Sequence, residues 1–475
     1  MGFFERPDPR LAQSADPAPS AAIARALKRQ GLALLVCFVA IAALYAIDVG
    51  IGLRESAATQ GSFYIAGLHS PVTIVRDERD VPHIRAADEH DLYFAQGYVE
   101  GSDRLFQLDL SRRYAYGRLA EVLGPKALPY DKAQRAVNID GIARRQLDAL
   151  APRDRSALLA FSDGVNAAAE TQPLPVEFRI LIYRPAAWSV KDSLAVSIVA
   201  SLELADSWHD IFARDAVWRR GGERCFDAAF PLSDARYDVG VAGTLVTRKT
   251  VARTRACDDS SVAARASGLR VGSNTWAAGG ARSSDGNALL ANDPHIDLTV
   301  PGIWYLVELD SPQVHVAGAA IPGIPGVALG HNERLAWASV NAAMATTSSF
   351  QAGRLSHGSW ATERIGVRFA RDVLVRYYRT AHEFSVADEN DPSGVALVRW
   401  PIYAESHSTI ATELAIDRAR SAGEALRVLS RYRGSPQGFM VADRSGAVAY
   451  HVAGIVPNDP AWGRYVHPAR DLREA

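Results

Sequence analysis

The stretch Gly272-Ser273-Asn274-Thr275-Trp276 divides the chain into two parts with different patterns. Residues 251–271, which precede it, are rich in Ala, Ser, Arg and Asp and show no sustained period of 2 or 3.6. The short apolar runs that follow it, at 276–279 and 287–292, are typical of strands. Taken alone, these five residues fit a loop that enters a strand.

Ser273 would become the first residue of a new polypeptide if the bond before it were cut. An α-amino group has an unperturbed pKa of roughly 7.7–8.0, so a terminal serine carries its own base beside its hydroxyl. Gly272 suits such a cleavage because a residue without a side chain tolerates a strained backbone and a close approach. The junction therefore suggests a nucleophile that is made by chain cleavage.

Several further motifs surround the junction in a fixed order. They are Val81-Pro82-His83-Ile84, Asp103-Arg104-Leu105-Phe106-Gln107-Leu108, Gly117-Arg118-Leu119-Ala120-Glu121, Asn292-Asp293-Pro294-His295, Pro301-Gly302-Ile303-Trp304-Tyr305, and the segments 317–326 and 330–337. Their order and spacing, over about residues 70–460, resemble the penicillin acylase family of N-terminal-nucleophile amidohydrolases.

The periodicity predicts a helix-rich part followed by a strand-rich part, which is typical of an α+β fold. Helices are expected over Leu92–Arg118, Ala133–Leu150 and Asp192–Arg219, and later strands within Ala370–Thr380, Val395–Tyr403 and Gly438–Ala453. The resemblance implies the four-layer αββα sandwich of this class, incomplete here, with Ser273 at the start of a central strand.

The N-terminal apolar run, together with the resemblance for the residues after it, divides the chain into segments. These are a cytoplasmic tail (1–30), a transmembrane signal-anchor (31–53), an α-subunit-like helix-rich segment (60–250), a spacer peptide (251–272) and the N-terminal part of a β-subunit-like domain (273–475).

Composition limits the class of protein but not its chemistry. The chain has 475 residues, 48% of them hydrophobic, which is enough for a large core. A net charge of −1 provides no basic field for nucleic acid. Three cysteines do not make a disulfide framework. Cys225 and Cys257 offer one possible bridge in an oxidising compartment, and two unpaired thiols are the alternative.

The N-terminal region predicts an exported protein. Leu32 to Ile47 is uncharged and apolar, and Lys28 and Arg29 precede it. A basic flank before such a run is typical of a secretory signal or signal-anchor. The long polar stretch before it favours an uncleaved, single-pass anchor, and a buried core helix is the alternative. We therefore expect the body outside the cytoplasmic membrane, in the periplasm.

The resemblance assigns roles in catalysis. It implies a precursor in which the Ser273 hydroxyl attacks the Gly272 carbonyl, so that the chain cuts itself and the α and β chains stay associated. Ser273 would then hydrolyse the linear amide of a small N-acyl substrate. His295 would orient the nucleophile, and the backbone of Asn341, or of Ala342 one residue further, would stabilise the oxyanion.

Other residues near the motifs have structural alternatives. We expect His83 and His331 to pin turns and strands. Trp304, Tyr305, Phe106 and Phe350 are candidates for an acyl pocket, although aromatic residues at such positions are more often part of a core.

No cofactor is expected. The resemblance implies a structural calcium site, since many members of the family bind this ion, and the matching positions here are Ala345, Ser348 and Ile211. Calcium requires several oxygen ligands, which Ala and Ile do not supply. We therefore predict that this site is absent, unless Asp206 or Asp210 substitutes.

The resemblance stops near Gly454–Pro457, whereas family chains continue well beyond this point. The alternative function is therefore a catalytically inactive or truncated acylase-like envelope protein. The sequence does not distinguish β-lactam side chains, acyl-homoserine lactones and other N-acyl compounds as substrates.

Overall fold

The computed structural model divides into two compact units. One comprises the chain up to Ser56 together with Pro173–Ile182, and the other comprises the rest. The residues that the structure describes are 19–205, 211–230, 272–351, 358–387, 395–458, 462–463 and 466–467.

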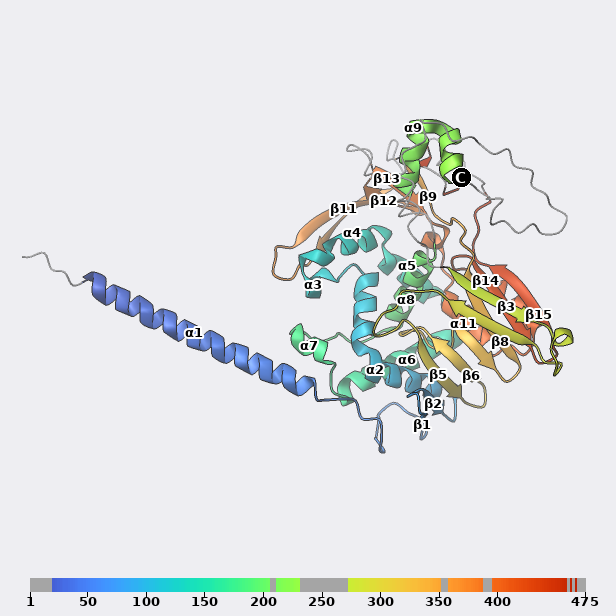
Figure 1. The fold of residues 1–475 in the computed structure, drawn as a ribbon, viewed down its shortest axis with the longest axis horizontal. Helices are drawn as coiled ribbons and strands as arrows, with labels where there is room; N and C mark the ends of the chain where they lie inside the picture. Colours follow the sequence, from blue (N-terminus) through green and yellow to red (C-terminus); the bar gives the residue numbers. More distant parts are fainter. Residues whose placement is uncertain are drawn as a thin grey trace, which may run out of the picture. The chain divides into compact units, whose positions relative to one another are not determined.

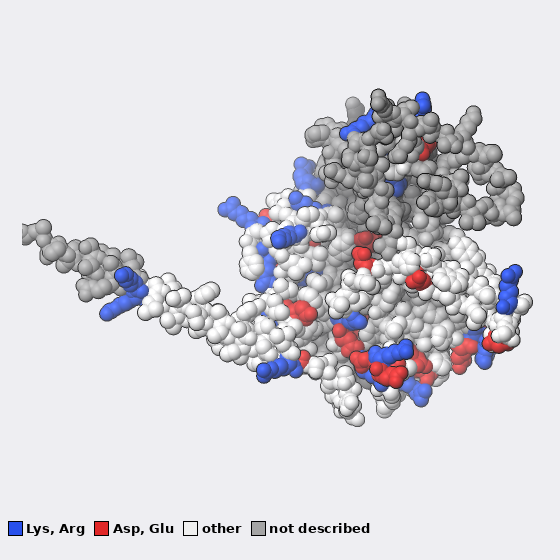
Figure 2. All heavy atoms as spheres, viewed as in Figure 1, with Lys and Arg blue, Asp and Glu red and all other residues white. Residues whose placement is uncertain are grey.

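The smaller unit contains the long helix α1 (Pro19–Gly52) and the short helix α7 (Val176–Ile180). Within Lys28–Gly52 of α1, an 18-residue window has a mean hydropathy of 2.6, and Figure 2 shows a long stretch of this helix without charged side chains. Arg179 of α7 pairs with Asp48 at 2.6 Å and so neutralises the one acid in the apolar run. The length and composition of α1 fit either a membrane span or a signal sequence.

The larger unit contains both helices and sheets, which confirms the mixed α+β content. Figure 1 shows α2, α5, α6 and α8 grouped beside the larger sheet. The α-helices are α2 (Glu89–Ala115), α3 (Ala120–Leu123), α4 (Leu128–Val137), α5 (Ile139–Ala149), α6 (Pro152–Thr171), α8 (Val190–Glu203), α9 (Ile211–Ala229), α11 (Thr409–Ile416) and α12 (Ala422–Leu429).

The larger sheet has the strand order β1-β2-β5-β6-β7-β8-β14-β15, and all of its neighbours are antiparallel except β2 and β5. Its strands are β1 (Thr73–Arg76), β2 (Pro82–Arg85), β5 (Tyr305–Asp310), β6 (His315–Ala320), β7 (Leu329–Asn332), β8 (Leu335–Asn341), β14 (Gln437–Asp443) and β15 (Val448–Ala453).

A six-stranded sheet has the order β10-β11-β12-β13-β9-β16, and β3 with β4 forms a separate two-stranded sheet. The strands are β9 (Ser348–Gln351), β10 (Ser359–Ile365), β11 (Val373–Arg379), β12 (Glu383–Ala387), β13 (Val395–Arg399), β16 (Val466–His467), β3 (Ser273–Ala278) and β4 (Leu289–Pro294). The four-layer sandwich stays a prediction.

Helices α2 and α6 cross at two glycines. A Cβ atom on Gly97 would lie 2.0 Å from the carbonyl oxygen of Phe161, and one on Gly164 would lie 1.9 Å from that of Phe94. Only residues without a side chain let the two backbones approach this closely. The crossing therefore depends on both glycines.

Helix α2 also clamps the loop between β6 and β7 through buried polar side chains. Gln96 accepts the N–H of Gly326 at 2.9 Å and donates to its carbonyl at 3.1 Å. Glu100 accepts the N–H of Gly323 at 2.9 Å and the amide of Gln96 at 3.0 Å. Burial raises the pKa of Glu100 to about 8, against the effect of these two donors. The clamp fixes the loop to the helix.

Two of the expected helices are each interrupted. The segment 133–150 contains the end of α4 and all of α5, because Asn138 adopts a left-handed conformation (φ 57°) between them and caps α5. A single helix over 192–219 is wrong, because α8 ends at Glu203. Near its end, Ser435 donates to the carbonyl of Ser201 at 2.5 Å and Asn341 to that of Leu204 at 3.5 Å.

The expected later strands are present with sharper boundaries. Gly438–Ala453 is a hairpin of β14 and β15 that turns at Gly446 (φ 86°). Strand β13 ends at Arg399, where Pro401 begins a 3-10 turn. Cys225 is buried and disulfide-bonded, while Cys257 and nearly all of the expected spacer (251–271) lie outside the described residues.

Candidate active site

Ser273 is the first residue of β3, which pairs antiparallel with β4. Burial alternates along β3, so that Ser273 and Thr275 lie on the more buried face, and Asn274 and Trp276 on the exposed face. The hairpin contacts β8 and β14 of the larger sheet (Figure 1). The serine therefore begins a strand that packs against this sheet.

The peptide group before Ser273 is held by the neighbouring strand. The carbonyl oxygen of Gly272 accepts the N–H of His295 at 3.1 Å. A Cβ atom on Gly272 would meet no described atom within 4 Å. A hydrogen bond to this oxygen polarises the carbonyl and favours negative charge on the oxygen.

His295 directly follows β4, in which Pro294 pairs with Ser273. Its ring Nε2 lies 2.8 Å from the Asp293 carboxylate, and 43% of the side chain is exposed. The pairing therefore brings His295 to the cleavage junction through its backbone, while its imidazole bonds to Asp293.

Asn292 has a role that the sequence analysis missed. Its Nδ2 atom donates to the carbonyl of Asn274 at 3.0 Å and to that of Ser339 in β8 at 3.3 Å. This one side chain therefore joins both strands of the hairpin to the larger sheet. The sequence Leu-Leu-Ala-Asn-Asp-Pro over 289–294 does not alternate between apolar and polar residues, so it carried no signal that Asn292 lies on the more buried face of the strand.

Asn341 is the last residue of β8, and its side chain accepts the N–H of Ala343 at 2.9 Å. The N–H of Ala342 is already bonded to the carbonyl of Pro436 at 3.1 Å. Successive residues of a strand direct their N–H groups to alternate sides. The Asn341 N–H therefore points away from β14, on the side where β7 pairs with β8 only as far as Trp337.

His83 and His331 lie on strands, where they were expected to have structural roles. His83 of β2 is paired with Glu308 of β5, and its hydrogen bond to Glu308 raises the pKa of the imidazole. His331 lies in β7. Tyr305 and Phe350 are 5% and 2% exposed and belong to the core, and the Tyr305 hydroxyl donates to Asp103 at 2.6 Å.

The positions that match the family's calcium ligands do not fit the ion. Ala345 has no side-chain oxygen, and the Ser348 hydroxyl is buried and accepts the N–H of Gly463 at 3.2 Å. Asp206 and Asp210 lie outside the described residues, so the absence of this site stays a prediction.

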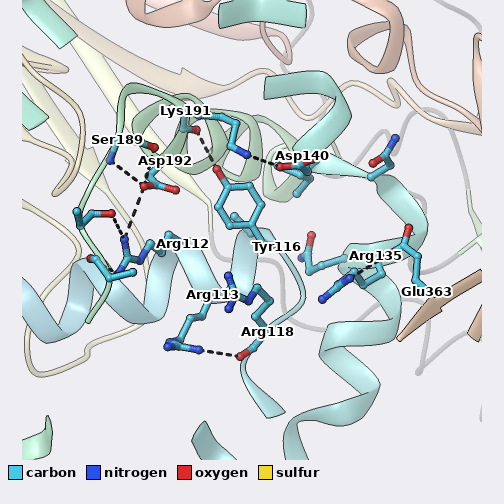
Figure 3. Close-up of a pocket in the computed structure, with 16 residues that line it drawn as sticks. Arg112, Arg113, Tyr116, Arg118, Arg135, Asp140, Ser189, Lys191, Asp192 and Glu363 are labelled. Carbon is cyan, nitrogen blue, oxygen red and sulfur yellow. Dashed lines mark hydrogen bonds and ion pairs between the residues drawn. The ribbon is translucent and has the colours of Figure 1, made fainter. Parts of the chain in front are cut away.

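A pocket of about 480 Å³ lies among α2, α4, α5 and α8 (Figure 3). Its charged groups take part in ion pairs: Lys191 bonds to Asp140 at 2.6 Å and Arg135 to Glu363 at 3.0 Å within the pocket, and Arg113 and Arg118 bond to Glu121 outside it. Neither Ser273, His295 nor Asn341 lines it. Such mutual pairing is typical of a structural ion-pair network.

Known proteins resemble most of this chain. The sequence profile of the family "Penicillin amidase" matches residues 71–474. Penicillin acylase 2 proenzyme from Pseudomonas sp. (strain SE83) is 29% identical, over 84% of this chain and 54% of its own length. Acyl-homoserine lactone acylase QuiP from Pseudomonas aeruginosa is 29% identical, over 86% of this chain and 53% of its own length.

Among solved structures, the thermostable penicillin G acylase from Alcaligenes faecalis (tetragonal form) is 26% identical, with a TM-score of 0.33, covering 37% of this chain and 98% of that chain. The chain spans about half the length of the two Pseudomonas relatives. The profile match extends over most of the sequence and includes every motif around Ser273. This chain is a member of the penicillin amidase family.

Proposed function

We propose that this chain is an amidohydrolase of the penicillin acylase type that cleaves itself between Gly272 and Ser273. The mature enzyme hydrolyses a linear N-acyl amide, with Ser273 as its nucleophile. The relatives named as penicillin acylase and acyl-homoserine lactone acylase support this class of substrate.

One observation carries the proposal. The hydroxyl that would attack belongs to the first residue of β3, and the oxygen of the peptide bond to be cut accepts a backbone N–H from His295. As the hydroxyl adds to the Gly272 carbonyl, negative charge develops on this oxygen, and a donor 3.1 Å away stabilises it. The adduct then collapses: the bond between the Gly272 carbonyl carbon and the Ser273 nitrogen breaks, the nitrogen takes the hydroxyl proton, and the freed amine is left beside an ester. Water hydrolyses this ester, which separates the two chains and restores the Ser273 hydroxyl.

In the mature enzyme the same serine attacks the substrate amide. Its α-amino group accepts the hydroxyl proton, directly or through one water. The backbone N–H of Asn341 serves as an oxyanion donor, which is supported by its direction away from β14. After cleavage the Gly272 carbonyl no longer belongs to the serine strand, so His295 is kept beside Ser273 by the pairing of β4 with β3, in which the preceding Pro294 lies opposite Ser273.

The two products of cleavage remain one body. Strand β2, from the first product, pairs with β5 from the second, and Gln96 and Glu100 of α2 hold the Gly323–Gly326 loop. These interactions are independent of the bond before Ser273. We therefore expect α and β chains that copurify under native conditions.

We also propose that α1 anchors the body in the cytoplasmic membrane, with the body in the periplasm. The support is its apolar stretch Lys28–Gly52, which is 25 residues long. Membrane fractionation and protease accessibility of spheroplasts test this, and a body that is protected in intact spheroplasts would contradict it.

Substitution of the nucleophile tests the enzyme assignment. Ser273→Ala should abolish both cleavage, seen as two bands on a denaturing gel, and release of acyl groups from a panel of N-acyl amides and acyl-homoserine lactones. Ser283→Ala is the matched control, because it removes a serine from the exposed turn of the same hairpin. N-terminal sequencing of the smaller wild-type fragments should identify Ser273.

The outcomes separate the enzyme from its alternative. Cleavage that persists in Ser273→Ala contradicts the proposed nucleophile. A wild-type chain that stays intact and releases no acyl group supports a catalytically inactive envelope protein.

A further inference from the structure

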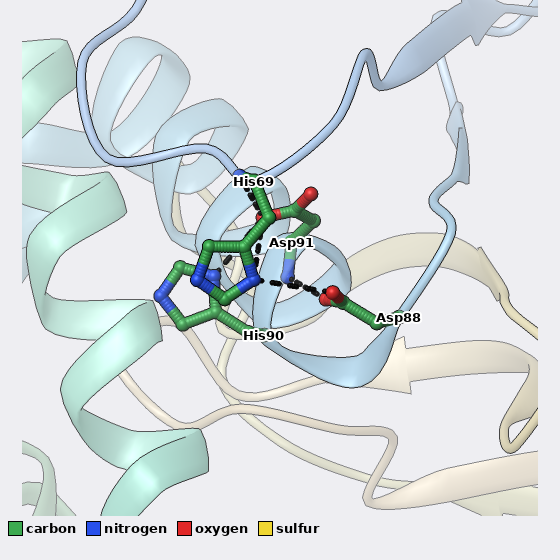
Figure 4. Close-up of side chains that lie close together, drawn as sticks. All are labelled: His69, Asp88, His90 and Asp91. Carbon is green, nitrogen blue, oxygen red and sulfur yellow. Dashed lines mark hydrogen bonds and ion pairs between the residues drawn. The ribbon is translucent and has the colours of Figure 1, made fainter.

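Four side chains of the larger unit, none of them from the serine junction, lie close together (Figure 4). His69 lies on the segment that leads into β1. Asp88 is the N-cap of α2, and His90 and Asp91 belong to the first turn of that helix. Within the part of the chain that the structure describes, these are the His and Asp residues close enough to hold a metal ion together.

The ligand atoms are already spaced almost as a metal ion requires. One oxygen or nitrogen atom from each residue lies within 4.8 Å of all the others. His69 Nδ1 lies 3.1 Å from Asp88 Oδ2 and 3.9 Å from Asp91 Oδ1, and His90 Nδ1 lies 3.0 Å from Asp91 Oδ1. A tetrahedral ion with bonds of about 2.0–2.1 Å separates its ligands by roughly 3.3 Å.

The two imidazoles are stacked on each other, and each one bonds to one of the two carboxylates. Their rings stack with centroids 4.0 Å apart and planes inclined by 16°. His69 Nδ1 bonds to Asp88 Oδ2 at 3.1 Å and His90 Nδ1 to Asp91 Oδ1 at 3.0 Å, so both Nδ1 atoms turn toward the two carboxylates (Figure 4).

Asp91 is held in place by the backbone. Its carboxylate is fully buried and accepts the N–H groups of His69 at 2.9 Å and Ser70 at 2.8 Å. These bonds fix the carboxylate and the His69 backbone relative to each other, as supporting hydrogen bonds do around metal ligands. The His69 and Asp88 side chains are 59% and 42% exposed, which leaves a path for an ion from solvent.

Two imidazoles with two carboxylates suit zinc and related transition ions, whereas calcium and magnesium prefer oxygen ligands alone. We propose that His69, Asp88, His90 and Asp91 bind a divalent transition metal ion of the zinc class. The ion fastens the segment that leads into β1 to the start of α2. This inference does not depend on the proposed acylase activity.

Metal titration tests the site. The tag-free full chain, solubilised in detergent and stripped with EDTA, should bind one equivalent of Zn²⁺ by isothermal titration calorimetry with a Kd of about 1 μM or tighter. The substitution His69→Asn, at an exposed side chain, should weaken Zn²⁺ binding roughly 100-fold. The double variant that also carries His90→Asn should not bind Zn²⁺. Zn²⁺ should also slow amide exchange in residues 57–72 of the wild type.

A second histidine pair provides the control. His83 and His315 flank Glu308, one on each of its oxygens. The variant His83→Asn with His315→Asn should keep the wild-type affinity for Zn²⁺. The wild type and His69→Asn should have equal melting temperatures without metal, which would show that the variant binds Zn²⁺ more weakly although it is folded. A wild type that binds no Zn²⁺ at 100 μM, or a control that loses as much affinity as His69→Asn, overturns the proposal.

Discussion

Two regions of the larger unit are built in opposite ways. One is the frame, by which we mean α2, α6 and the Gly323–Gly326 loop, and the other is the β3–β4 hairpin. In the frame, α2 crosses α6 at backbone contact distance and inserts the fully buried Gln96 and Glu100 into a loop. The hairpin has two strands, and Trp276 and Leu289 on it are 56% and 59% exposed. Yet the residue assigned the chemistry, Ser273, lies on the hairpin.

We infer from this difference that the frame provides most of the stability, whereas the residue proposed for catalysis lies on the hairpin. Tight packing and satisfied buried polar groups make the frame intolerant of small changes. The hairpin makes fewer contacts, so changes there should act locally. Four substitutions test this contrast.

Gly97→Ala should have the largest effect. The new methyl group would lie 2.0 Å from the Phe161 carbonyl oxygen, which cannot move without separating α2 from α6. We expect a loss of about 3 kcal/mol or more in the free energy of unfolding. Thermal and urea denaturation monitored by circular dichroism measure it.

Gly423→Ala in α12 is the control, because its new methyl group meets only the end of Arg427, at 3.9 Å. There the higher helix propensity of alanine should stabilise the chain by up to about 1 kcal/mol. Equal effects of the two substitutions would contradict the close crossing.

Glu100→Gln should change how stability depends on pH. The folded-state pKa of about 8 is above the ordinary 4.5, so the stability contributed by protonated Glu100 is fully present below pH 4.5 and is lost as pH rises toward 8. The loss in the wild type is on the order of 3–5 kcal/mol.

Glutamine does not titrate and has only one acceptor oxygen for two donors, which costs about 1–2 kcal/mol at every pH. The variant should therefore be less stable than the wild type at pH 5, and the gap should close or reverse by pH 8. Urea denaturation at both pH values measures this. Parallel pH profiles of the two proteins would show that Glu100 keeps its ordinary pKa.

The sequence predicted the helices of the frame better than the contacts that hold the hairpin to the larger sheet. The helical pattern located α2 almost to its ends, because from Val99 to Ala115 the buried residues recur at helical spacing, although residues 91–97 are buried on every side. The strands of the hairpin also followed from short apolar runs before turns. The break at Asn138 was missed, since a left-handed asparagine leaves no mark in a hydrophobic pattern.

The candidate site was predicted only in part. Ser273 and His295 were found through motifs, and their backbones lie at one junction because β3 pairs with β4. The anchoring role of Asn292 depends on a carbonyl in β8, which is distant in sequence. The convergence of His69 with His90 likewise depends on how the loop before β1 returns to α2, which no local pattern encodes.

Asn292→Ala should have a moderate and local effect. It removes the hydrogen bonds to the carbonyls of Asn274 and Ser339, which should cost about 1–2 kcal/mol. Hydrogen exchange should accelerate for residues 273–294 and stay unchanged in α2. Asn292→Asp is the matched control, since its carboxylate has a similar size but cannot donate to a carbonyl, and it should accelerate exchange at least as much. Uniform acceleration over the whole chain would mean that the hairpin and the frame open together.

Trp276→Thr should have the smallest effect. More than half of the tryptophan is exposed, and threonine has a high β propensity, so the free energy of unfolding should change by no more than about 0.5 kcal/mol. Trp337 in β8 is the matched control, because it is 1% exposed and donates to the carbonyl of Ala328 at 3.2 Å. Trp337→Ala should cost about 3–5 kcal/mol. If Trp276→Thr lowered the free energy of unfolding as much as Trp337→Ala, the hairpin would contribute as much to stability as the larger sheet. The inference that the hairpin contributes little to stability would then be wrong.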